Sequence, residues 1–280
     1  MRIARTIAEL HRLGVAGGVF VPTMGALHEG HASLMAIARR RAGTSLPVVA
    51  SVFVNPTQFN EAADFDRYPR TFGADAAMCE QAGVDALFAP SAGEVYPEGM
   101  DVPKGDLPPV ATQPGLEDAR RPGHFAGVCQ VVRRLFAIVE PAAAVFGEKD
   151  WQQLQVISAM VATEGLGVEI VPGPTVREPD GLAMSSRNRL LSRADRAAAG
   201  GMPRALAAAA RLPDVEAAEA AMRRELALAG LEPEYAAVRD AQTLLSPRDT
   251  RPARALIAAR AGSVRLIDNG PWEPSSPSHG

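Results

Sequence analysis

The sequence predicts an α/β fold in which a doubly wound, mostly parallel sheet precedes a smaller α+β domain. Through the first two thirds of the 280 residues, short apolar runs alternate with segments of helical periodicity, which is the pattern of strands joined by crossover helices. After about Arg177 this alternation gives way to Ala/Arg/Glu-rich helical segments followed by strand-like runs. We therefore expect one domain over residues 1–175, a second over 176–270, and a disordered Pro/Ser-rich tail over 271–280.

The individual elements follow from these periodicities. Apolar runs predict strands over 18–22, 48–54, 86–89, 143–146 and 168–171. Helical patterns occupy 6–13, 32–41, 73–82, 128–139 and 151–163. In the second domain we expect helices over 192–211 and 215–228, then strands over 235–239, 255–259 and 264–267. Parallel sheets of this kind bind ligands at the carboxyl ends of their strands, where Thr23, Asn55 and Gly147 fall.

Composition narrows the class of protein. The chain is 47% hydrophobic and 22% charged, as is ordinary for a globular protein. A net charge of −3 argues against a protein that coats nucleic acid or an anionic membrane. The start of the chain is amphipathic, and no apolar run approaches the ~20 residues that span a bilayer. We expect a soluble, cytoplasmic protein whose two cysteines, Cys79 and Cys129, are buried reduced thiols.

The segment over residues 22–31 is the strongest chemical signal. A strand, a glycine turn and a helix N-terminus succeed one another, an arrangement that exposes backbone N–H groups to a phosphate. His28 and His31, three residues apart, share a face of the first helical turn. They could be metal ligands, structural histidines or phosphate contacts. Their HxxH spacing is not the HExxH of zinc hydrolases, and the adjacent glycine turn favours phosphate contact.

Lysine is rare in this chain, since Lys104 and Lys149 are the only two among 29 basic residues. Lys104 lies in a Pro/Gly-rich stretch and is expected to be solvated. Lys149 directly follows the 143–146 strand, where a nucleotide phosphate would lie. Asp150 beside it could cap the next helix or contact a nucleotide.

Two further segments offer polar side chains. Asn55 and Gln58 place neutral amides at a strand end, although a capped, proline-terminated strand would also explain them. The stretch over 64–69 suits a covering loop. Residues 184–188 combine two hydroxyls with Arg187, which fits either a lid over a triphosphate or a surface turn.

Taken together, these segments resemble the pantoate–β-alanine ligase family, within the HxGH nucleotidyltransferase superfamily that includes class I aminoacyl-tRNA synthetases. The matching strings are PTMGALHEGH (22–31), FVNPTQF (53–59), DRYPR (66–70), RPGHFAGV (121–128), FGEKDWQQL (146–154), PTVRE (174–178) and DGLAMSSRN (180–188). They occur in the family's order. The span from 19 to 55 is shorter than the family pattern, which affects the loop around 41–47 and not the site.

The resemblance implies a Rossmann-like catalytic domain and a C-terminal lid domain that carries the SSRN loop. It implies ATP-dependent joining of (R)-pantoate to β-alanine through a pantoyl adenylate, with release of AMP and pyrophosphate. It also implies Mg²⁺ accompanying the ATP, no metal ligated by the protein, and a homodimer. Two alternatives remain at this point: another adenylate-forming member of the superfamily, and a catalytically silent nucleotide-binding module. The absence of a basic surface disfavours a tRNA synthetase.

Residue roles come from the same resemblance. His28, His31, Lys149 and Arg187 correspond to the catalytic groups, with His31 a hydrogen-bond donor near the α-phosphate. Gln58 and Gln153 correspond to pantoate-binding amides, and Gln58 also to a β-alanine contact. Asn55, Tyr68 and Arg121 are second-tier candidates. The ATP-contacting set comprises Met24, Gly25, Ala26, Leu27, His28, Glu29, Gly30, His31, Gly147, Glu148, Lys149, Asp150 (through ribose), Val176 (through its backbone), Met184, Ser185, Ser186 and Arg187.

Overall fold

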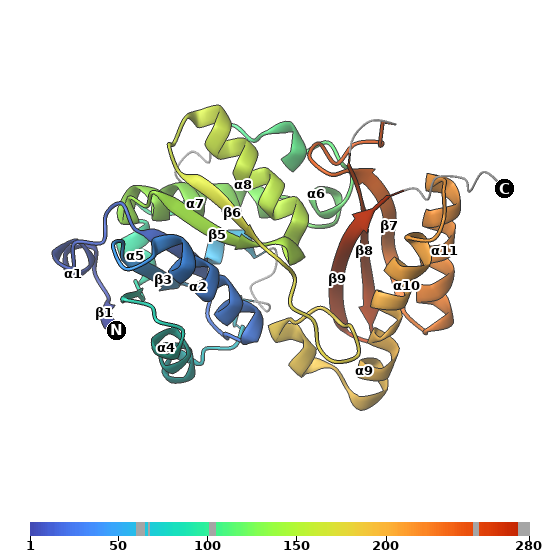
Figure 1. Ribbon diagram of the computed structural model, residues 1–280, viewed down its shortest axis with the longest axis horizontal. Helices are drawn as coiled ribbons and strands as arrows, with labels where there is room; N and C mark the ends of the chain where they lie inside the picture. Colours follow the sequence, from blue (N-terminus) through green and yellow to red (C-terminus); the bar gives the residue numbers. More distant parts are fainter. Residues whose placement is uncertain (60–64, 67, 101–104, 249–251, 274–280) are drawn as a thin grey trace. The chain divides into compact units, whose positions relative to one another are not determined.

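The computed structural model describes residues 1–59, 65–66, 68–100, 105–248 and 252–273. The chain forms two compact units, coloured along the sequence in Figure 1. The first comprises Met1–Glu148 and Gln152–Pro174, and the second comprises Lys149–Trp151 and Thr175–Gly280. The sequence predicts a single division, at 175/176. It does not indicate that Lys149–Trp151, from the middle of the chain, belongs to the C-terminal unit. The assignment of separate domains, one of them a lid, stays a prediction.

The first unit contains a parallel sheet of six strands in the order β1-β4-β3-β2-β5-β6. These strands are β1 (Arg2–Ala4), β2 (Val19–Thr23), β3 (Val48–Val52), β4 (Ala86–Phe88), β5 (Ala143–Gly147) and β6 (Glu169–Gly173). Val19 of β2 lies opposite Val48 on one side and Ala143 on the other. The chain runs outward from β2 in both directions, so a topological switch point lies between β2 and β5.

Helices α1 (Ile7–Arg12), α2 (Glu29–Ala42), α4 (Phe72–Gln81), α5 (Ala92–Val95), α6 (Glu117–Arg120), α7 (His124–Val139) and α8 (Trp151–Glu164) accompany this sheet, with α8 beginning at the last residue of the Lys149–Trp151 segment. Single turns of 3₁₀ helix are η1 (Pro56–Gln58), η2 (Pro109–Ala111) and η3 (Glu148–Asp150). Met35 of α2 packs with Val21, Ala50 and Val145 of the central strands in one buried cluster. In the described part of the chain, no helix combines the length and apolar character needed to cross a membrane.

The five strands and five helices expected in this region are all present, with displaced ends. The helix expected from 32 begins at Glu29, and the one expected from 128 begins at His124. Strand β1 was not predicted, because three residues are too few to display a period. Both cysteines are buried as expected, and desolvation raises the pKa of the Cys79 thiol to about 12 and that of Cys129 to about 11.

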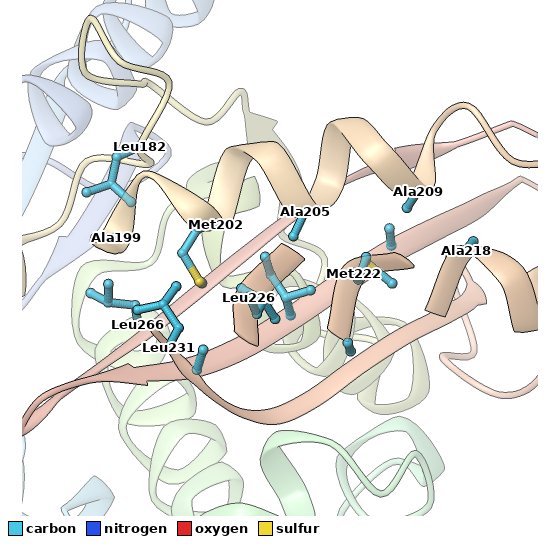
Figure 2. Close-up of a cluster of buried hydrophobic side chains, with 14 of the residues drawn as sticks. Leu182, Ala199, Met202, Ala205, Ala209, Ala218, Met222, Leu226, Leu231 and Leu266 are labelled. Carbon is cyan, nitrogen blue, oxygen red and sulfur yellow. The ribbon is translucent and has the colours of Figure 1, made fainter. Parts of the chain in front are cut away.

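The second unit is built on an antiparallel sheet in the order β7-β8-β9, formed by Glu232–Asp240, Ala253–Ala261 and Val264–Trp272. It also contains η4 (Ser186–Leu190) and helices α9 (Arg193–Ala199), α10 (Gly201–Ala209) and α11 (Val215–Leu228). Figure 2 shows Met202 of α10, Met222 and Leu226 of α11 and Leu266 of β9 among the side chains of one buried cluster. The alanines at the helix contact let the two helices approach each other closely.

Two expectations for this unit need correction. The single helix expected over 192–211 is two helices that meet at Gly200. Pro203 lacks the N–H that a continuous helix would need but is tolerated in the first turn of a new one. Strand β9 also runs on through Pro271 and Trp272, where the tail was expected to begin. Trp272 is buried, and its indole N–H donates to the carbonyl of Ala209 at 3.1 Å. The rest of the expected tail, 274–280, lies outside the described residues.

Candidate active site

The turn after β2 has a backbone that only a narrow set of residues allows. Gly25 and Ala26 both have positive φ, +83° and +51°. A Cβ at Gly25 would lie 3.0 Å from both the Asp75 carboxylate and the Val52 side chain. Glycine is therefore required here by conformation and by space. The turn ends at His28, which is the N-cap of α2 and lies at the carboxyl edge of the sheet.

A buried carboxylate that sequence reasoning missed holds this turn in place. Asp75 of α4 is 1% exposed. Its two oxygens accept hydrogen bonds from Ala26 N at 3.1 Å and Leu27 N at 2.8 Å, and Thr71 Oγ1 donates to it at 3.1 Å. One available signal was that Asp75 and Cys79, four residues apart, share the buried face of the predicted helix, where a charge is unusual.

The two histidines lie side by side at the start of α2, as their spacing predicts. The ring centroids are 4.2 Å apart. His28 accepts through Nδ1 from Gly30 N at 3.1 Å, and His31 accepts through Nδ1 from His28 N at 3.3 Å. Because both Nδ1 atoms accept, each neutral imidazole carries its proton on Nε2. Two ring N–H donors thus accompany a helix N-terminus, whose dipole favours an anion.

An amide network follows β3. Asn55 donates through Nδ2 to Gln58 Oε1 and to the carbonyl of Gly127, both at 3.2 Å, and accepts at Oδ1 from the Tyr96 hydroxyl at 2.9 Å. Asn55 also caps η1, so the capped-strand interpretation of this residue is part of its role. The Gln58 amide N–H₂ contacts Met24 Sδ. Burial raises the pKa of Tyr96, which keeps its hydroxyl a donor at neutral pH.

The backbone of Gln58 is held by a second pair. His124 lies with Nδ1 3.0 Å from the Gln58 carbonyl and Nε2 3.0 Å from Arg121. Because a guanidinium only donates, Nε2 is the acceptor and Nδ1–H the donor. Arg121, a second-tier candidate, also lies 3.7 Å from the Glu117 carboxylate. Tyr96 was not expected from sequence, and His124 was part of a matching string with no role assigned to it, since both act through contacts with distant segments.

Adjacent glutamines on α8 have different surroundings. Gln152 is buried; it accepts from Glu117 N and donates to the Val110 carbonyl and to Asp118, each at 3.0 Å. Gln153 is half-buried, and its side chain makes no hydrogen bond to the described residues. Gln152 therefore serves the fold, and Gln153 has its amide available for a ligand.

The remaining predicted residues of the first unit lie at the same edge of the sheet. Gly147 is the last residue of β5, next to β2, and Glu148 begins η3. The first unit thus gathers Met24–His31, Gln58 and Gly147 at the carboxyl ends of neighbouring strands. Tyr68 stacks edge-on against Phe59, with ring centroids 5.7 Å apart. Part of the expected covering loop, residues 64 and 67, and Lys104 lie outside the described residues.

The second unit carries the lysine and the Ser-Ser-Arg segment. Lys149 Nζ lies 3.5 Å from Asp150 Oδ1. Val176 accepts at its carbonyl from Met184 N at 3.0 Å, which closes a short hairpin. Ser185 Oγ accepts from Arg187 N at 3.3 Å and caps η4, in which Ser186 is the first residue. Arg187 is exposed and forms no ion pair within the described part of the chain.

No metal-binding group is evident in these surroundings. Among the described residues, His, Cys, Asp and Glu side chains nowhere gather in threes in a way that could hold a metal ion. The Asp75 carboxylate beside the turn is occupied by two backbone N–H groups and a hydroxyl.

A glycine turn that leads into a helix at the switch point of a parallel sheet is common to many nucleotide enzymes, and comparison with known proteins narrows the choice of family. A family model for pantoate-beta-alanine ligase matches residues 2–271. The chain belongs to the pantoate–β-alanine ligase family. A pantothenate synthetase of Acidothermus cellulolyticus is 48% identical over 282 residues, covering 96% of this chain and 91% of that protein. One of Myxococcus xanthus is 49% identical over 270 residues, covering 93% and 89%.

Solved structures of the pantoate–β-alanine ligase family share the fold. Pantothenate synthetase from Thermus thermophilus superposes with a TM-score of 0.89 at 46% identity, covering 96% of this chain and 99% of that one. A pantoate-beta-alanine ligase from Francisella tularensis, complexed with beta-gamma ATP and beta-alanine, has a TM-score of 0.78 at 32% identity, covering 98% and 100%. The family predicted from the motifs and the fold class predicted from the periodicity are confirmed; the role of each site residue stays a prediction.

Proposed function

We propose that this chain condenses (R)-pantoate with β-alanine, using ATP, through a pantoyl-adenylate intermediate. Membership of the pantoate–β-alanine ligase family over residues 2–271 supports the reaction, and a relative has been solved with an ATP compound and β-alanine. The observation that carries the proposal is the turn over 24–28, which Asp75 fixes and which leads into α2, where His28 and His31 keep their protons on Nε2.

The first step transfers adenylate. A pantoate carboxylate oxygen attacks the α-phosphorus of ATP and pyrophosphate leaves. His28 and His31 donate hydrogen bonds to the phosphoryl oxygens on which charge develops, and Lys149 and Arg187 neutralise the phosphates. Ser185 and Ser186 contact the same phosphates, Asp150 the ribose, and the Val176 backbone the adenine. Because the enzyme forms no covalent bond, its contribution is positioning and charge stabilisation.

Magnesium belongs to the substrate in this scheme. It would enter with ATP, because the phosphate oxygens of the nucleotide suit a hard cation.

In the second step the amine of β-alanine attacks the acyl carbon and AMP leaves. Gln58 and Gln153 hold pantoate through neutral amides, which orient the acid without the ion pair that would make its carboxylate a poorer nucleophile. Asn55 fixes which end of the Gln58 amide faces which partner, because its Nδ2–H can meet only the oxygen. Gln58 therefore presents its N–H₂ group on the side of Met24, and we assign it the additional contact with β-alanine.

Pyrophosphate release from ATP, measured with and without pantoate, tests the function. Pantoate-dependent release, followed by pantothenate formation on addition of β-alanine, supports the assignment. Release with another carboxylic acid instead would identify a different adenylate-forming enzyme. ATP binding without release under any of these conditions would identify a nucleotide-binding module.

Replacing the lysine tests the assigned charge. Lys149→Ala should cost on the order of 2–4 kcal/mol in the adenylation transition state, because one preorganised charge-stabilising donor is removed. Pantoate-dependent ATP–pyrophosphate exchange measures the loss. The other lysine supplies a matched control, since Lys104→Ala should leave exchange unchanged. An exchange rate within threefold of the parent for Lys149→Ala would exclude the role.

Assembly and location follow from the resemblance. We include in the proposal a homodimer and residence in the cytoplasm. Sedimentation velocity at micromolar concentration tests the first, and a monomeric value would overturn it.

A further inference from the structure

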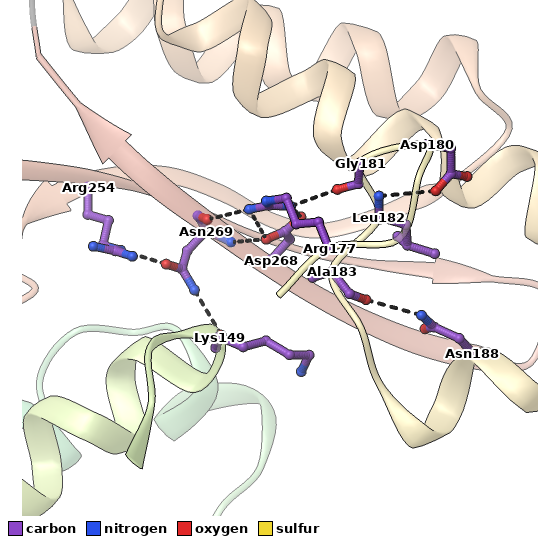
Figure 3. Close-up of polar contacts among 10 residues, drawn as sticks. All are labelled: Lys149, Arg177, Asp180, Gly181, Leu182, Ala183, Asn188, Arg254, Asp268 and Asn269. Atoms are coloured by element: carbon purple, nitrogen blue, oxygen red, sulfur yellow. Dashed lines mark hydrogen bonds and ion pairs between the residues drawn. The ribbon is translucent and has the colours of Figure 1, made fainter. Parts of the chain in front are cut away.

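Lys149 is held by the C-terminal sheet, although it directly follows a strand of the other sheet. Asn269 of β9, which is buried, donates through Nδ2 to the carbonyl of Lys149 at 2.8 Å (Figure 3). Arg254 of β8 donates through Nε to Asn269 Oδ1 and so fixes the amide in the orientation that offers its N–H₂ to Lys149. The Arg254 guanidinium also lies 3.5 Å from the centroid of the Trp151 ring.

The neighbouring residue on β9 holds a different segment. Asp268, 2% exposed, forms a two-point ion pair with Arg177, at 2.8 Å to one guanidinium nitrogen and 3.0 Å to the other. Arg177 donates further to the carbonyls of Asn269 and Gly181, at 3.2 and 2.9 Å. Because Arg177 pairs with Ala183 across the hairpin that leads to Ser185, this ion pair sets the position of the hairpin.

The strand register explains how adjacent residues serve two segments. Asp268 lies opposite Ile257, whose side chain belongs to the buried cluster under α10 and α11. Asn269 lies opposite Leu256, on the other face of the sheet. Consecutive side chains of a strand point to opposite faces. One dipeptide therefore reaches the hairpin from one face and the lysine segment from the other.

We propose that Asp268 and Asn269 are positioning residues that hold Lys149 and the 176–188 hairpin as one block. This inference rests on the proposed function, in which Lys149 and Arg187 neutralise phosphates of the same nucleotide. Lys149–Trp151 belongs to the C-terminal unit while Glu148 and Gln152 belong to the other. The dipeptide keeps the lysine in a constant relation to the hairpin that leads to the Ser-Ser-Arg segment, since it bonds to Lys149 and to Arg177 of that hairpin. Only the Asp268 side of this ion pair is buried, since the Arg177 side chain is 33% exposed.

Asn269→Asp and Asn269→Ala test the proposal through pantoate-dependent ATP–pyrophosphate exchange. The aspartate keeps an acceptor for Arg254 but replaces the donor to Lys149 with an oxygen, whereas the alanine removes both contacts. We expect kcat to fall on the order of 10–100-fold in both variants, as for a misplacement of about 1 Å, with KM for pantoate unchanged. Glu234→Gln is the matched control, because it weakens the ion pairs with Arg260 and Arg265 in the same sheet and should leave kcat within twofold.

A double mutant separates positioning from general support of the fold. If Asn269 acts through Lys149, then Asn269→Asp added to Lys149→Ala should cause no further loss of exchange. Multiplying losses, or a kcat within twofold for the single variants, would overturn the proposal. If the parent shows no ATP–pyrophosphate exchange with any acid, the proposed function fails and the positioning role needs a separate test.

Amide hydrogen exchange of a peptide covering 149–151 provides that test. Asn269→Asp should accelerate it and Glu234→Gln should not; equal rates in the two variants would overturn the positioning role.

Discussion

Asp75 shows how one residue outside every motif can decide the shape of a binding turn. A carboxylate this deeply buried is costly unless its charge is met by donors. Here the donors are two backbone N–H groups of the turn and the Thr71 hydroxyl. The turn and the carboxylate stabilise each other. These hydrogen bonds maintain the positive φ angles of Gly25 and Ala26. The histidines begin immediately after it.

Asp75→Asn removes the charge and one acceptor while preserving the side-chain shape. Its amide N–H₂ would face a backbone N–H, so unfolding free energy should fall by about 1–3 kcal/mol. KM for ATP in pyrophosphate exchange should rise about tenfold, equivalent to roughly 1.4 kcal/mol of lost binding. Urea unfolding and exchange kinetics measure the two effects.

Asp85→Asn is the control for Asp75→Asn. Like Asp75, Asp85 accepts a hydrogen bond from a backbone N–H. Its donor is Val48 N, at 2.8 Å, at the amino end of β3. Asp85→Asn should lower the free energy of unfolding without changing KM for ATP. Equal KM values in the two variants would show that the turn does not depend on Asp75.

At the scale of elements, the site depends on how closely α7 approaches η1. A Cβ at Gly127 would lie 2.2 Å from the carbonyl oxygen of Thr57. The carbonyl of Gly127 also accepts from Asn55, which orients Gln58. The one glycine therefore sets both the spacing of the two helices and the direction of the amide network.

Gly127→Ala should force α7 and η1 apart. Overpacking of this kind costs on the order of 1–3 kcal/mol of unfolding free energy. KM for pantoate should rise more than KM for ATP, because Gln58 moves while the turn over 24–28 stays. Steady-state kinetics with each substrate varied separately measure the ratio.

The control for Gly127→Ala is a helical glycine in open space. Gly73 of α4 is exposed, and nothing lies within 4 Å of the position of its Cβ. Gly73→Ala should be neutral or slightly stabilising, since it reduces the freedom of the unfolded chain. A larger rise in KM for ATP than for pantoate in Gly127→Ala would contradict the assigned role of the amide network.

Periodicity in the sequence predicted the elements, and local motifs predicted the family, but neither could predict the supports of the site. The helix that begins at Glu29 was expected to begin three residues later, at Ala32, where the helical pattern starts; His28 caps it. Asp75 lies 48 residues from Leu27, and Asn269 lies 120 residues from Lys149. Such pairings depend on strand order and register, which one sequence does not contain.

At the scale of the whole molecule, each unit buries its own apolar cluster. The cluster around β2, β3 and β5 draws its buried residues from 19–145, and the one under α10 and α11 draws its buried residues from 182–272. Separate cores allow one unit to open while the other keeps its hydrogen bonds. Because Lys149–Trp151 belongs to the second unit, we expect this segment to open together with the C-terminal strands.

Met222→Ala creates a cavity in the C-terminal cluster and should destabilise that unit by about 2–5 kcal/mol. Hydrogen exchange followed by mass spectrometry should show faster exchange of β7, β8 and β9, with β2, β3 and β5 unchanged. Peptides covering 149–151 should follow the C-terminal strands, because Asn269 and Arg254 hold that segment. Met35→Ala, the same change in the other cluster, should produce the opposite pattern. Uniform acceleration in both variants would show that the two clusters unfold together, and a 149–151 peptide that follows β5 would place the lysine with the parallel sheet.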